Sequence, residues 1–153
     1  MNSVVDIYNK ALEFKRKYPK TIAWRLKSHA KVVHKFLNPG EEVQYVFVSQ
    51  KNYQWYNIMS TYMVVLTNKR ILLAQKRLLF GYWYLAITPD MFNDLTVKSG
   101  IIWGKVNLDT IKEIVVLSNL DKRALPEIET AITEYMMEKK QQMIKIEKNQ
   151  VNI

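Results

Sequence analysis

The side chains best able to bind a metal or transfer a proton near neutral pH are two histidines, His29 and His34. They stand five residues apart in a segment with helical periodicity, and that spacing turns them about 140° away from each other. Two imidazoles with this orientation cannot share a metal ion, so we expect His29 to be a hydrogen-bonded residue at the edge of the core. The chain has no cysteine, which excludes disulfides and thiolate ligands. The sequence therefore predicts no metal site.

The sequence also has no residue pattern typical of nucleophilic catalysis or of phosphate binding by a glycine-rich loop. No serine has nucleophile-elbow spacing, and no glycine-rich loop could cradle a phosphate. Asp90 and Asp94 could meet across a turn, but a turn-forming residue and a solvent-facing strand residue explain them better. We predict no catalytic residue, no cofactor and no small-molecule substrate, and we expect a binding protein and not an enzyme.

Positive charge is the chemistry that the chain does concentrate. The net charge is +9, and residues 1–40 contain nine basic and two acidic side chains, a surplus of seven. Counted from Lys20 at 100° per residue through the predicted helix of residues 21–37, four lysines and a tryptophan fall within about 80° of arc. These candidate residues for binding an anionic surface are Lys20, Trp24, Lys27, Lys31 and Lys35.

Three interpretations of this basic stripe stay open. It could be a solvated helix face, because like charges four residues apart repel each other and the isolated helix gains nothing from them. It could contact an acidic lipid leaflet, which would turn that repulsion into attraction. It could also follow the phosphate backbone of a nucleic acid without reading its sequence.

A second candidate site combines aromatic rings with cations at the predicted mouth of a barrel. The loop at residues 51–57 holds three rings between polar neighbours, and a later turn adds two cations. Such rings suit a bilayer interface or a protein hot spot, although they could equally fold back on their own barrel. The candidate residues are Lys51, Tyr53, Trp55, Tyr56, Lys76 and Arg77.

The turn at residues 67–70 contains Lys69 and Arg70, which together resemble a phosphate clamp. We interpret it as structural. In this interpretation Asn68 adopts a left-handed turn conformation, and the two cations discourage pairing at a strand edge.

The elements that must position these residues follow from periodicity. Helices are predicted over residues 3–18, with Ser3 as N-cap, and over residues 21–37. Seven β-type runs follow at residues 43–48, 59–67, 70–76, 80–87, 92–98, 101–108 and 111–117. The second and third runs are apolar on both faces, which predicts that helices cover one side. A long amphipathic helix begins near Pro126, and its apolar stripe of Ile128, Ile132, Tyr135 and Met136 could plug a barrel end.

This order predicts a mainly β fold with helices and three units along the chain. They are a basic N-terminal helical adduct (1–38), a β domain closed by a helix (39–140) and a C-terminal tail (141–153). The start of the chain has no basic region followed by an apolar run, so we expect no signal peptide. The longest apolar run, Tyr82–Ile87, is far short of the roughly 20 residues of a membrane-spanning helix. We expect a cytoplasmic protein whose membrane contact, if it has one, is peripheral at the inner face.

Three segments of the chain resemble the bacterial pleckstrin-homology-like (PH-like) domains, in particular the group called YokE-like. These segments are residues 37–43 (LNPGEEV), residues 64–73 (VVLTNKRILL) and residues 97–106 (VKSGIIWGKV), and the resemblance covers about residues 30–138. It implies a bent seven-stranded antiparallel sheet capped by a C-terminal helix, with a non-enzymatic role. The basic residues do not reproduce the lipid motif of eukaryotic relatives, because the first two strands and their loop offer only Lys51.

Taken together, these patterns predict a non-catalytic binding module in the bacterial cytoplasm. Its expected partners are a protein or an anionic lipid surface reached through the basic helix. Two alternatives stay open: non-sequence-specific binding of nucleic acid, and a structural subunit that self-associates into a homo-oligomer through strand edges or the two helices.

Overall fold

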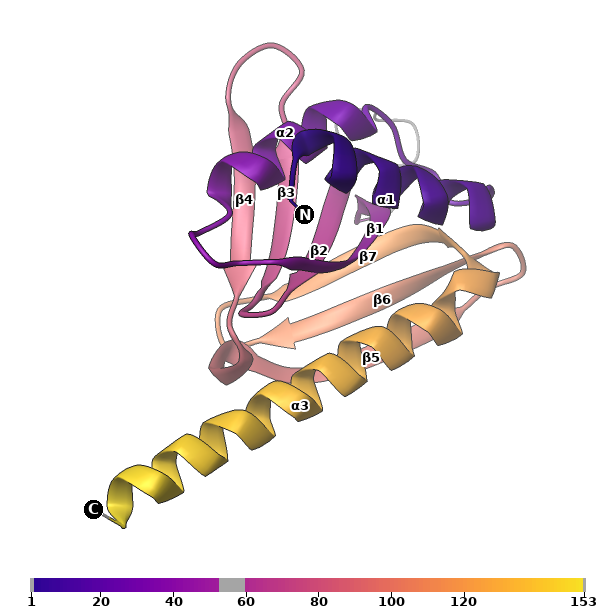
Figure 1. The fold of residues 1–153 in the computed structure, drawn as a ribbon. Coiled ribbons are helices and arrows are strands. Elements are labelled where there is room, and N and C mark those ends of the chain that lie inside the picture. Colours follow the sequence, from indigo (N-terminus) through magenta and orange to yellow (C-terminus); the bar gives the residue numbers. More distant parts are fainter. Residues whose placement is uncertain (1, 53–59, 153) are drawn as a thin grey trace.

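The computed structural model describes residues 2–52 and 60–152, which form three α-helices and seven strands (Figure 1). In chain order the elements are α1 (Val4–Lys17), α2 (Leu26–Phe36), β1 (Val43–Lys51), β2 (Thr61–Thr67), β3 (Ile71–Lys76), β4 (Tyr82–Ile87), β5 (Phe92–Ser99), β6 (Trp103–Thr110), β7 (Ile114–Asp121) and α3 (Leu125–Val151). Short 3₁₀ turns at Pro89–Met91 and Lys122–Ala124 precede β5 and α3.

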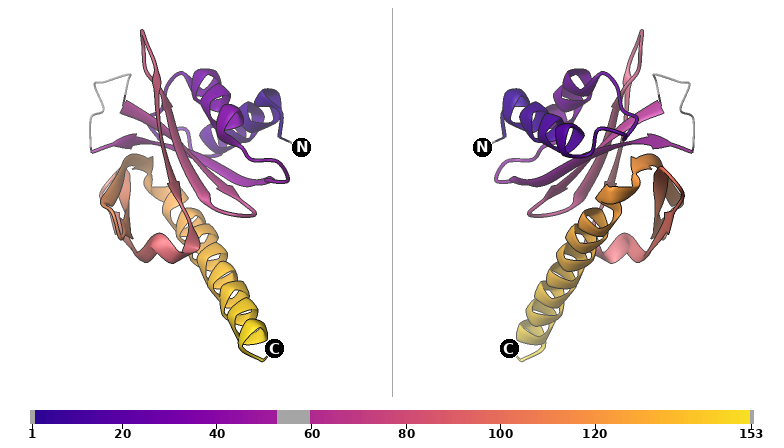
Figure 2. Two further views of the ribbon diagram at one scale, coloured as in Figure 1. Left: turned by 90° about the vertical axis from the view of Figure 1, so that its left-hand side faces the viewer. Right: turned by 90° about the vertical axis from the view of Figure 1, so that its right-hand side faces the viewer.

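All seven strands belong to one antiparallel sheet with the order β4-β3-β2-β1-β7-β6-β5. At the seam, β1 pairs with β7 only through Gln50 with Ser118 and Lys51 with Leu117, among the described residues. The sheet bends at this short seam, so that the β1–β4 half and the β5–β7 half lie at an angle (Figure 2). The predicted fold is confirmed: a bent seven-stranded sheet, a C-terminal helix and two N-terminal helices.

The two N-terminal helices cover one face of the β1–β4 half (Figure 1). Ser3 caps α1 as predicted, in a reciprocal capping box with Asp6. Ile7 and Phe14 of α1 are buried, and the ring of Phe14 lies 6.0 Å from that of Phe47 in β1. The helices bury one face of β2, a strand whose residues are all buried. The basic N-terminal part of the chain thus shares one hydrophobic core with the sheet.

The second helix is shorter than predicted. It begins at Leu26 and not at Thr21, because the polar groups of residues 21–24 bond to strands. The Ile22 N–H donates to the carbonyl of Asn119 at 2.9 Å, and the Trp24 N–H donates to the hydroxyl of Thr61 at 2.9 Å. These tertiary hydrogen bonds hold the segment in a non-helical conformation in spite of its helical periodicity. The prediction that Lys20 and Trp24 share a helix with the later lysines was therefore wrong.

One turn also differs from prediction. The predicted sixth run ends at residue 108 and the seventh begins at residue 111, which leaves Asp109–Thr110 as the turn, whereas β6 continues to Thr110 and the turn occupies residues 111–113. The Thr110 hydroxyl accepts the N–H groups of Lys112 and Glu113, which favours a turn just after it. Strand β7 consequently begins at Ile114 and runs to Asp121.

The C-terminal helix begins as predicted, with Pro126 in its first turn and its apolar stripe buried. It continues without a break to Val151, through the segment expected to be a tail. The distal part extends away from the sheet (Figure 2). Ile144 and Ile146 on this part are exposed. None of the helices in the described part of the chain combines the length and apolar character needed to cross a membrane.

Candidate functional site

Strand β3 has a Lys–Arg pair at each end, and the two pairs have different surroundings. Lys69 and Arg70 precede the strand, while Lys76 ends it and Arg77 follows. The contacts of each pair decide whether its charges are available to a ligand.

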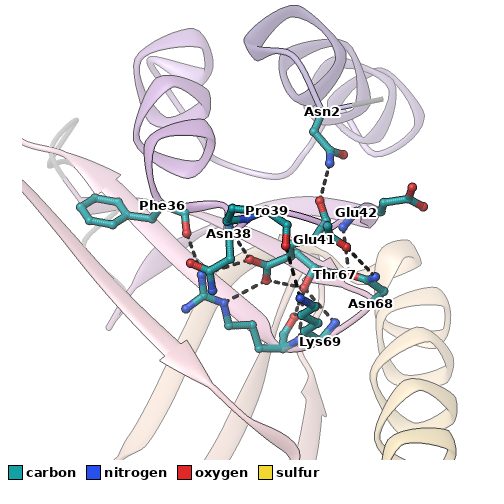
Figure 3. Close-up of polar contacts among 11 residues, drawn as sticks. Asn2, Phe36, Asn38, Pro39, Glu41, Glu42, Thr67, Asn68 and Lys69 are labelled. Atoms are coloured by element: carbon teal, nitrogen blue, oxygen red, sulfur yellow. Dashed lines mark hydrogen bonds and ion pairs between the residues drawn. The ribbon is translucent and has the colours of Figure 1, made fainter.

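At the first end Arg70 belongs to a polar cluster that we call the clasp, formed by Glu41, Thr67, Asn68 and Arg70; Figure 3 shows the cluster, with Glu41, Thr67 and Asn68 labelled. The Glu41 side chain is 0% exposed. Its Oε1 accepts from Arg70 Nε at 2.9 Å and from the Thr67 hydroxyl at 2.7 Å. Its Oε2 accepts from Arg70 Nη2 at 3.2 Å and from the backbone N–H of Asn38 at 2.8 Å.

The clasp also ties down the backbone around it. Arg70 Nη2 donates to the carbonyl of Phe36 at 2.7 Å. The Asn68 side chain accepts the Glu42 N–H at 2.8 Å and donates to the carbonyl of Gly40 at 3.1 Å. Burial opposes ionisation of Glu41, but the hydrogen bonds from its donors outweigh it and lower its pKa. The Arg70 charge is therefore neutralised inside the protein.

These contacts support a structural role for the turn, by a mechanism different from the predicted one. Asn68 does not have a positive φ; among the described residues only Arg25, Asn52, Asn119 and two glycines do. Strand β3 is also interior, paired with β2 and β4, so its cations protect no sheet edge. The side-chain amide of Asn68 and the Arg70–Glu41 ion pair provide the structural function.

Between the two N-terminal helices, residues 20–25 form a segment that we call the strap. It spans from the β5–β6 hairpin to the far end of β3. At its start, the carbonyl of Lys20 accepts the indole N–H of Trp103 at 2.7 Å. At its end, Arg25 Nη1 donates to the carbonyl of Lys76 at 2.9 Å. Lys20 and Trp24 are exposed on the strap.

His29 lies buried beneath the strap. Its Nδ1 accepts the backbone N–H of Lys76 at 2.8 Å, so Nε2 carries the proton and donates to the carbonyl of Trp24 at 3.0 Å. Burial, with a further contribution from the charge of Arg25, lowers the pKa of His29 to about 4. The neutral imidazole thus joins α2, the strap and β3, as expected of a hydrogen-bonded residue at the core edge.

Beside His29, α2 and the β3–β4 hairpin enclose an open groove with a cavity volume of about 280 Å³. Four cations and no acidic residue line it. Three cations come from the strap and α2 and one from β3, and the complete lining is Arg25, Ser28, Lys31, Val32, Lys35, Lys76 and Tyr82. None of these cations forms an ion pair with a described acidic side chain.

The hairpin that borders the groove ends in an apolar tip of Leu78, Leu79 and Phe80. Leu79 is 80% exposed and Phe80 is 85% exposed. In Figure 1 this hairpin extends beyond α2 into solvent. The sequence interpretation missed the tip because it assigned Phe80 to the following strand. The sequence signal was Gly81, a turn-forming residue directly after the three apolar residues; it has a positive φ of 76° in the structure.

A second apolar tip occurs on the β5–β6 hairpin. Ile101 is 89% exposed, and Ile102 and Trp103 are also exposed. Trp103 donates to Lys20, so the strap connects this tip to the groove. Exposed apolar side chains therefore lie at both ends of the strap.

Three of the five residues predicted to bind an anionic surface remain on one helix. Lys27, Lys31 and Lys35 are exposed at intervals of four residues along α2. Lys31 and Lys35 line the groove, while Lys20 and Trp24 lie on the strap.

The predicted barrel-mouth set is divided. Tyr53, Trp55 and Tyr56 lie outside the described residues. Lys51 lies 5.9 Å from the ring centre of Trp83, whereas Lys76 pairs across the sheet with Tyr82. Since successive residues of a strand point to opposite faces, Lys51 and Lys76 lie on opposite sides of the sheet.

Chemistry of other kinds has no arrangement to support it in residues 2–52 and 60–152. That part of the chain contains no group of three potential metal-binding side chains. Asp90 and Asp94 are exposed, and Asp94 accepts the N–H of its neighbour Leu95. The site consists of charge and exposed apolar surface.

Two comparisons with known proteins found matches to the chain. The model of a family described as "Bacterial PH domain" matches residues 37–134. A solved structure, the crystal structure of a pleckstrin homology domain from Shewanella amazonensis SB2B, is similar with a TM-score of 0.47 and 19% sequence identity. That similarity covers 70% of this chain and 84% of the other. No curated protein matches the chain.

Proposed function

Because the chain belongs to the bacterial PH domain family, we propose that it is a non-catalytic binding module that docks on an anionic membrane surface. Domains of this kind are generally binding modules. The family match does not identify the narrower YokE-like group, so membership of that group stays a prediction. The choice of partner rests on the surface of this chain.

The observation that carries the proposal is the exposed tip of Leu78, Leu79 and Phe80 beside the cationic groove. Transfer of such a side chain from water into an apolar medium is worth about 1.5–3 kcal/mol. Each cation near an acidic leaflet adds on the order of 1 kcal/mol. Three apolar side chains and the four cations of the groove thus supply roughly 8–13 kcal/mol of attraction before the costs of immobilisation.

The apolar tip favours a membrane over a nucleic acid. Lysines alone would bind either polyanion, because both present phosphates. A phosphate backbone, however, offers no apolar layer that could bury Leu79 and Phe80. Figure 1 places the tip beyond α2, so that a bilayer could receive the tip while its headgroups meet the cations of the groove. Protein binding and self-association remain as outcomes of the experiment.

The test is co-sedimentation of the full chain with phosphatidylcholine vesicles, with and without phosphatidylglycerol, at low and high salt. We expect binding only to the anionic vesicles, weakened by salt. The variant Leu79→Ser/Phe80→Ser should bind at least about tenfold more weakly, because it loses two inserted side chains. The control Ile144→Ser/Ile146→Ser changes two exposed apolar residues on the distal part of α3 and should bind as the wild type does.

Two results would contradict the proposal. One is no binding to anionic vesicles at low salt, in particular if RNA or DNA retains the protein under the same conditions. The other is equal loss of binding in the tip variant and in the α3 control. Sedimentation velocity of the free protein would separately show whether the chain self-associates.

A further inference from the structure

We propose that the groove between α2 and the β3–β4 hairpin is a binding site for a phosphomonoester group. This inference deepens the proposed function, since it names the headgroup chemistry that the docking surface selects. Its ligand is a dianionic phosphate, carried either by a lipid headgroup or by a soluble ester.

The groove combines size and charge suited to such a ligand. Its volume of about 280 Å³ is near the lower limit for small-molecule sites, which favours a group the size of a headgroup. Arg25, Lys31, Lys35 and Lys76 supply four positive charges, and Ser28 adds a hydroxyl. No carboxylate in the lining competes for these charges.

Three of the four cations are held in place by neighbouring groups. Arg25 Nη1 donates to the carbonyl of Lys76 at 2.9 Å, and Nη2 lies 3.5 Å from the carbonyl of Arg77. Lys76 Nζ donates to the carbonyl of Gly81 at 3.0 Å. Lys35 Nζ lies 4.6 Å from the ring centre of Tyr82. Positions held in advance reduce the conformational entropy lost when a ligand binds.

These contacts leave donors available. A guanidinium has five N–H groups, and Arg25 directs two of them, one on each Nη atom, at carbonyl oxygens. An ammonium has three N–H groups, and Lys76 donates one of them to a carbonyl oxygen. A phosphomonoester carries a charge of about −1.5 to −2 and three acceptor oxygens near neutral pH. A phosphodiester carries a single negative charge and would leave most of the positive charge in the groove uncompensated. The groove should therefore prefer monoesters.

The site is a property of this chain and does not follow from its family match. Arg25, Lys31 and Lys35 all precede residue 37, where the match begins. The strap and α2 bring these three cations to Lys76 at the end of β3.

The first experiment uses inorganic phosphate as the probe. Backbone amide resonances of the full chain are followed during phosphate titration at constant ionic strength, with sodium chloride as the reference. We expect saturable shifts at residues 25–35 and 76–82. In Lys31→Glu/Lys35→Glu the affinity should fall by about tenfold or more, because two cations become anions. The matched control Lys145→Glu/Lys148→Glu, with the same charge change on exposed α3 residues, should retain wild-type affinity.

The second experiment separates the two sources of phosphate. Vesicles containing phosphatidic acid, a monoester, are compared with phosphatidylglycerol vesicles of equal surface charge. We expect the wild type to prefer phosphatidic acid by about fivefold or more, the worth of one additional cation contact near a leaflet. Lys31→Glu/Lys35→Glu should lose the preference. Leu79→Ser/Phe80→Ser should bind both vesicles more weakly but keep it.

The outcomes are distinguishable. Saturable phosphate shifts without preference for phosphatidic acid would support the site and identify a soluble phosphate ester as its ligand. Absence of saturable shifts, or equal affinity in the α2 variant and the α3 control, would overturn the site. Tip-dependent binding to phosphatidylglycerol vesicles in that case would leave the proposed membrane docking intact.

Discussion

The two ends of β3 use the same residue types in opposite ways. At the clasp, Arg70 meets a buried carboxylate, and the polar groups around it bond to one another. At the groove, the side chains of Arg25 and Lys76 donate to carbonyl oxygens, and no acidic residue among the described ones lines the space beside them. A Lys–Arg pair therefore does not reveal its role by itself; the element packed against it decides.

The largest effect should come from removing the carboxylate of the clasp. Glu41→Ala leaves Arg70 partly buried without its counter-ion, and breaking such a pair costs about 3–5 kcal/mol of the free energy of unfolding. Urea denaturation measures the loss. The neighbouring Glu42 is exposed and contributes only backbone groups to the clasp, so Glu42→Ala should cost less than about 0.5 kcal/mol. If Glu41→Ala and Glu42→Ala lowered the free energy of unfolding equally, the ion pair of Glu41 with Arg70 would contribute no more to stability than an exposed side chain does.

The groove end has its own stability determinant in His29. Its pKa is about 4 in the folded protein, against about 6.5 in the unfolded chain. The folded state thus favours the neutral imidazole, and this stabilisation is complete above about pH 6.5 and is lost as the pH falls toward 4. The shift corresponds to about 3 kcal/mol.

Chemical denaturation between pH 7 and 5.5 measures the first part of this loss, before the carboxylates of the unfolded chain, with an ordinary pKa of about 4, begin to titrate. His34→Gln, at an exposed histidine, should keep the wild-type dependence. A wild-type free energy of unfolding that is flat over this interval would contradict the assignment of a neutral, hydrogen-bonded His29.

The smallest effect on stability should come from Arg77. This residue is exposed, and its side chain contacts no described acidic group. Arg77→Ala should change the free energy of unfolding by less than about 0.5 kcal/mol. The same variant should weaken binding to anionic vesicles by about fivefold, since one cation near the leaflet is worth on the order of 1 kcal/mol. If Arg77→Ala lost stability but bound anionic vesicles as the wild type does, Arg77 would have the structural role that the comparison gives to Arg70 in the clasp.

Much of the fold follows from local pattern. Alternation and turn residues located all seven strands, and the buried stripe from Ile128 to Met136 located α3 against the sheet. The errors occur where distant partners decide. Periodicity assigned residues 21–25 to a helix, because it carries no information about Thr61 or Asn119, whose hydrogen bonds hold the strap out of the helix.

The candidate site was only partly predictable for the same reason. The lysines of α2 were identified because their spacing is local to one helix. Their convergence with Lys76 depends on the packing of α2 against β3 and could not be read from the chain. The tip of Leu78 to Phe80 was missed because apolar residues are normally read as buried, and here they are exposed. The clasp joins Glu41 to Arg70 across 29 residues of sequence, beyond any local periodicity.

The most direct test of the account is hydrogen–deuterium exchange of the full chain with and without vesicles containing phosphatidylglycerol. We predict that vesicles slow exchange at residues 76–82 and along the strap, and leave exchange at the clasp and at residues 111–113 unchanged. Slowed exchange at the clasp end with none at residues 76–82, or no difference anywhere although the protein sediments with the vesicles, would contradict the claim that the groove end of β3 meets the membrane.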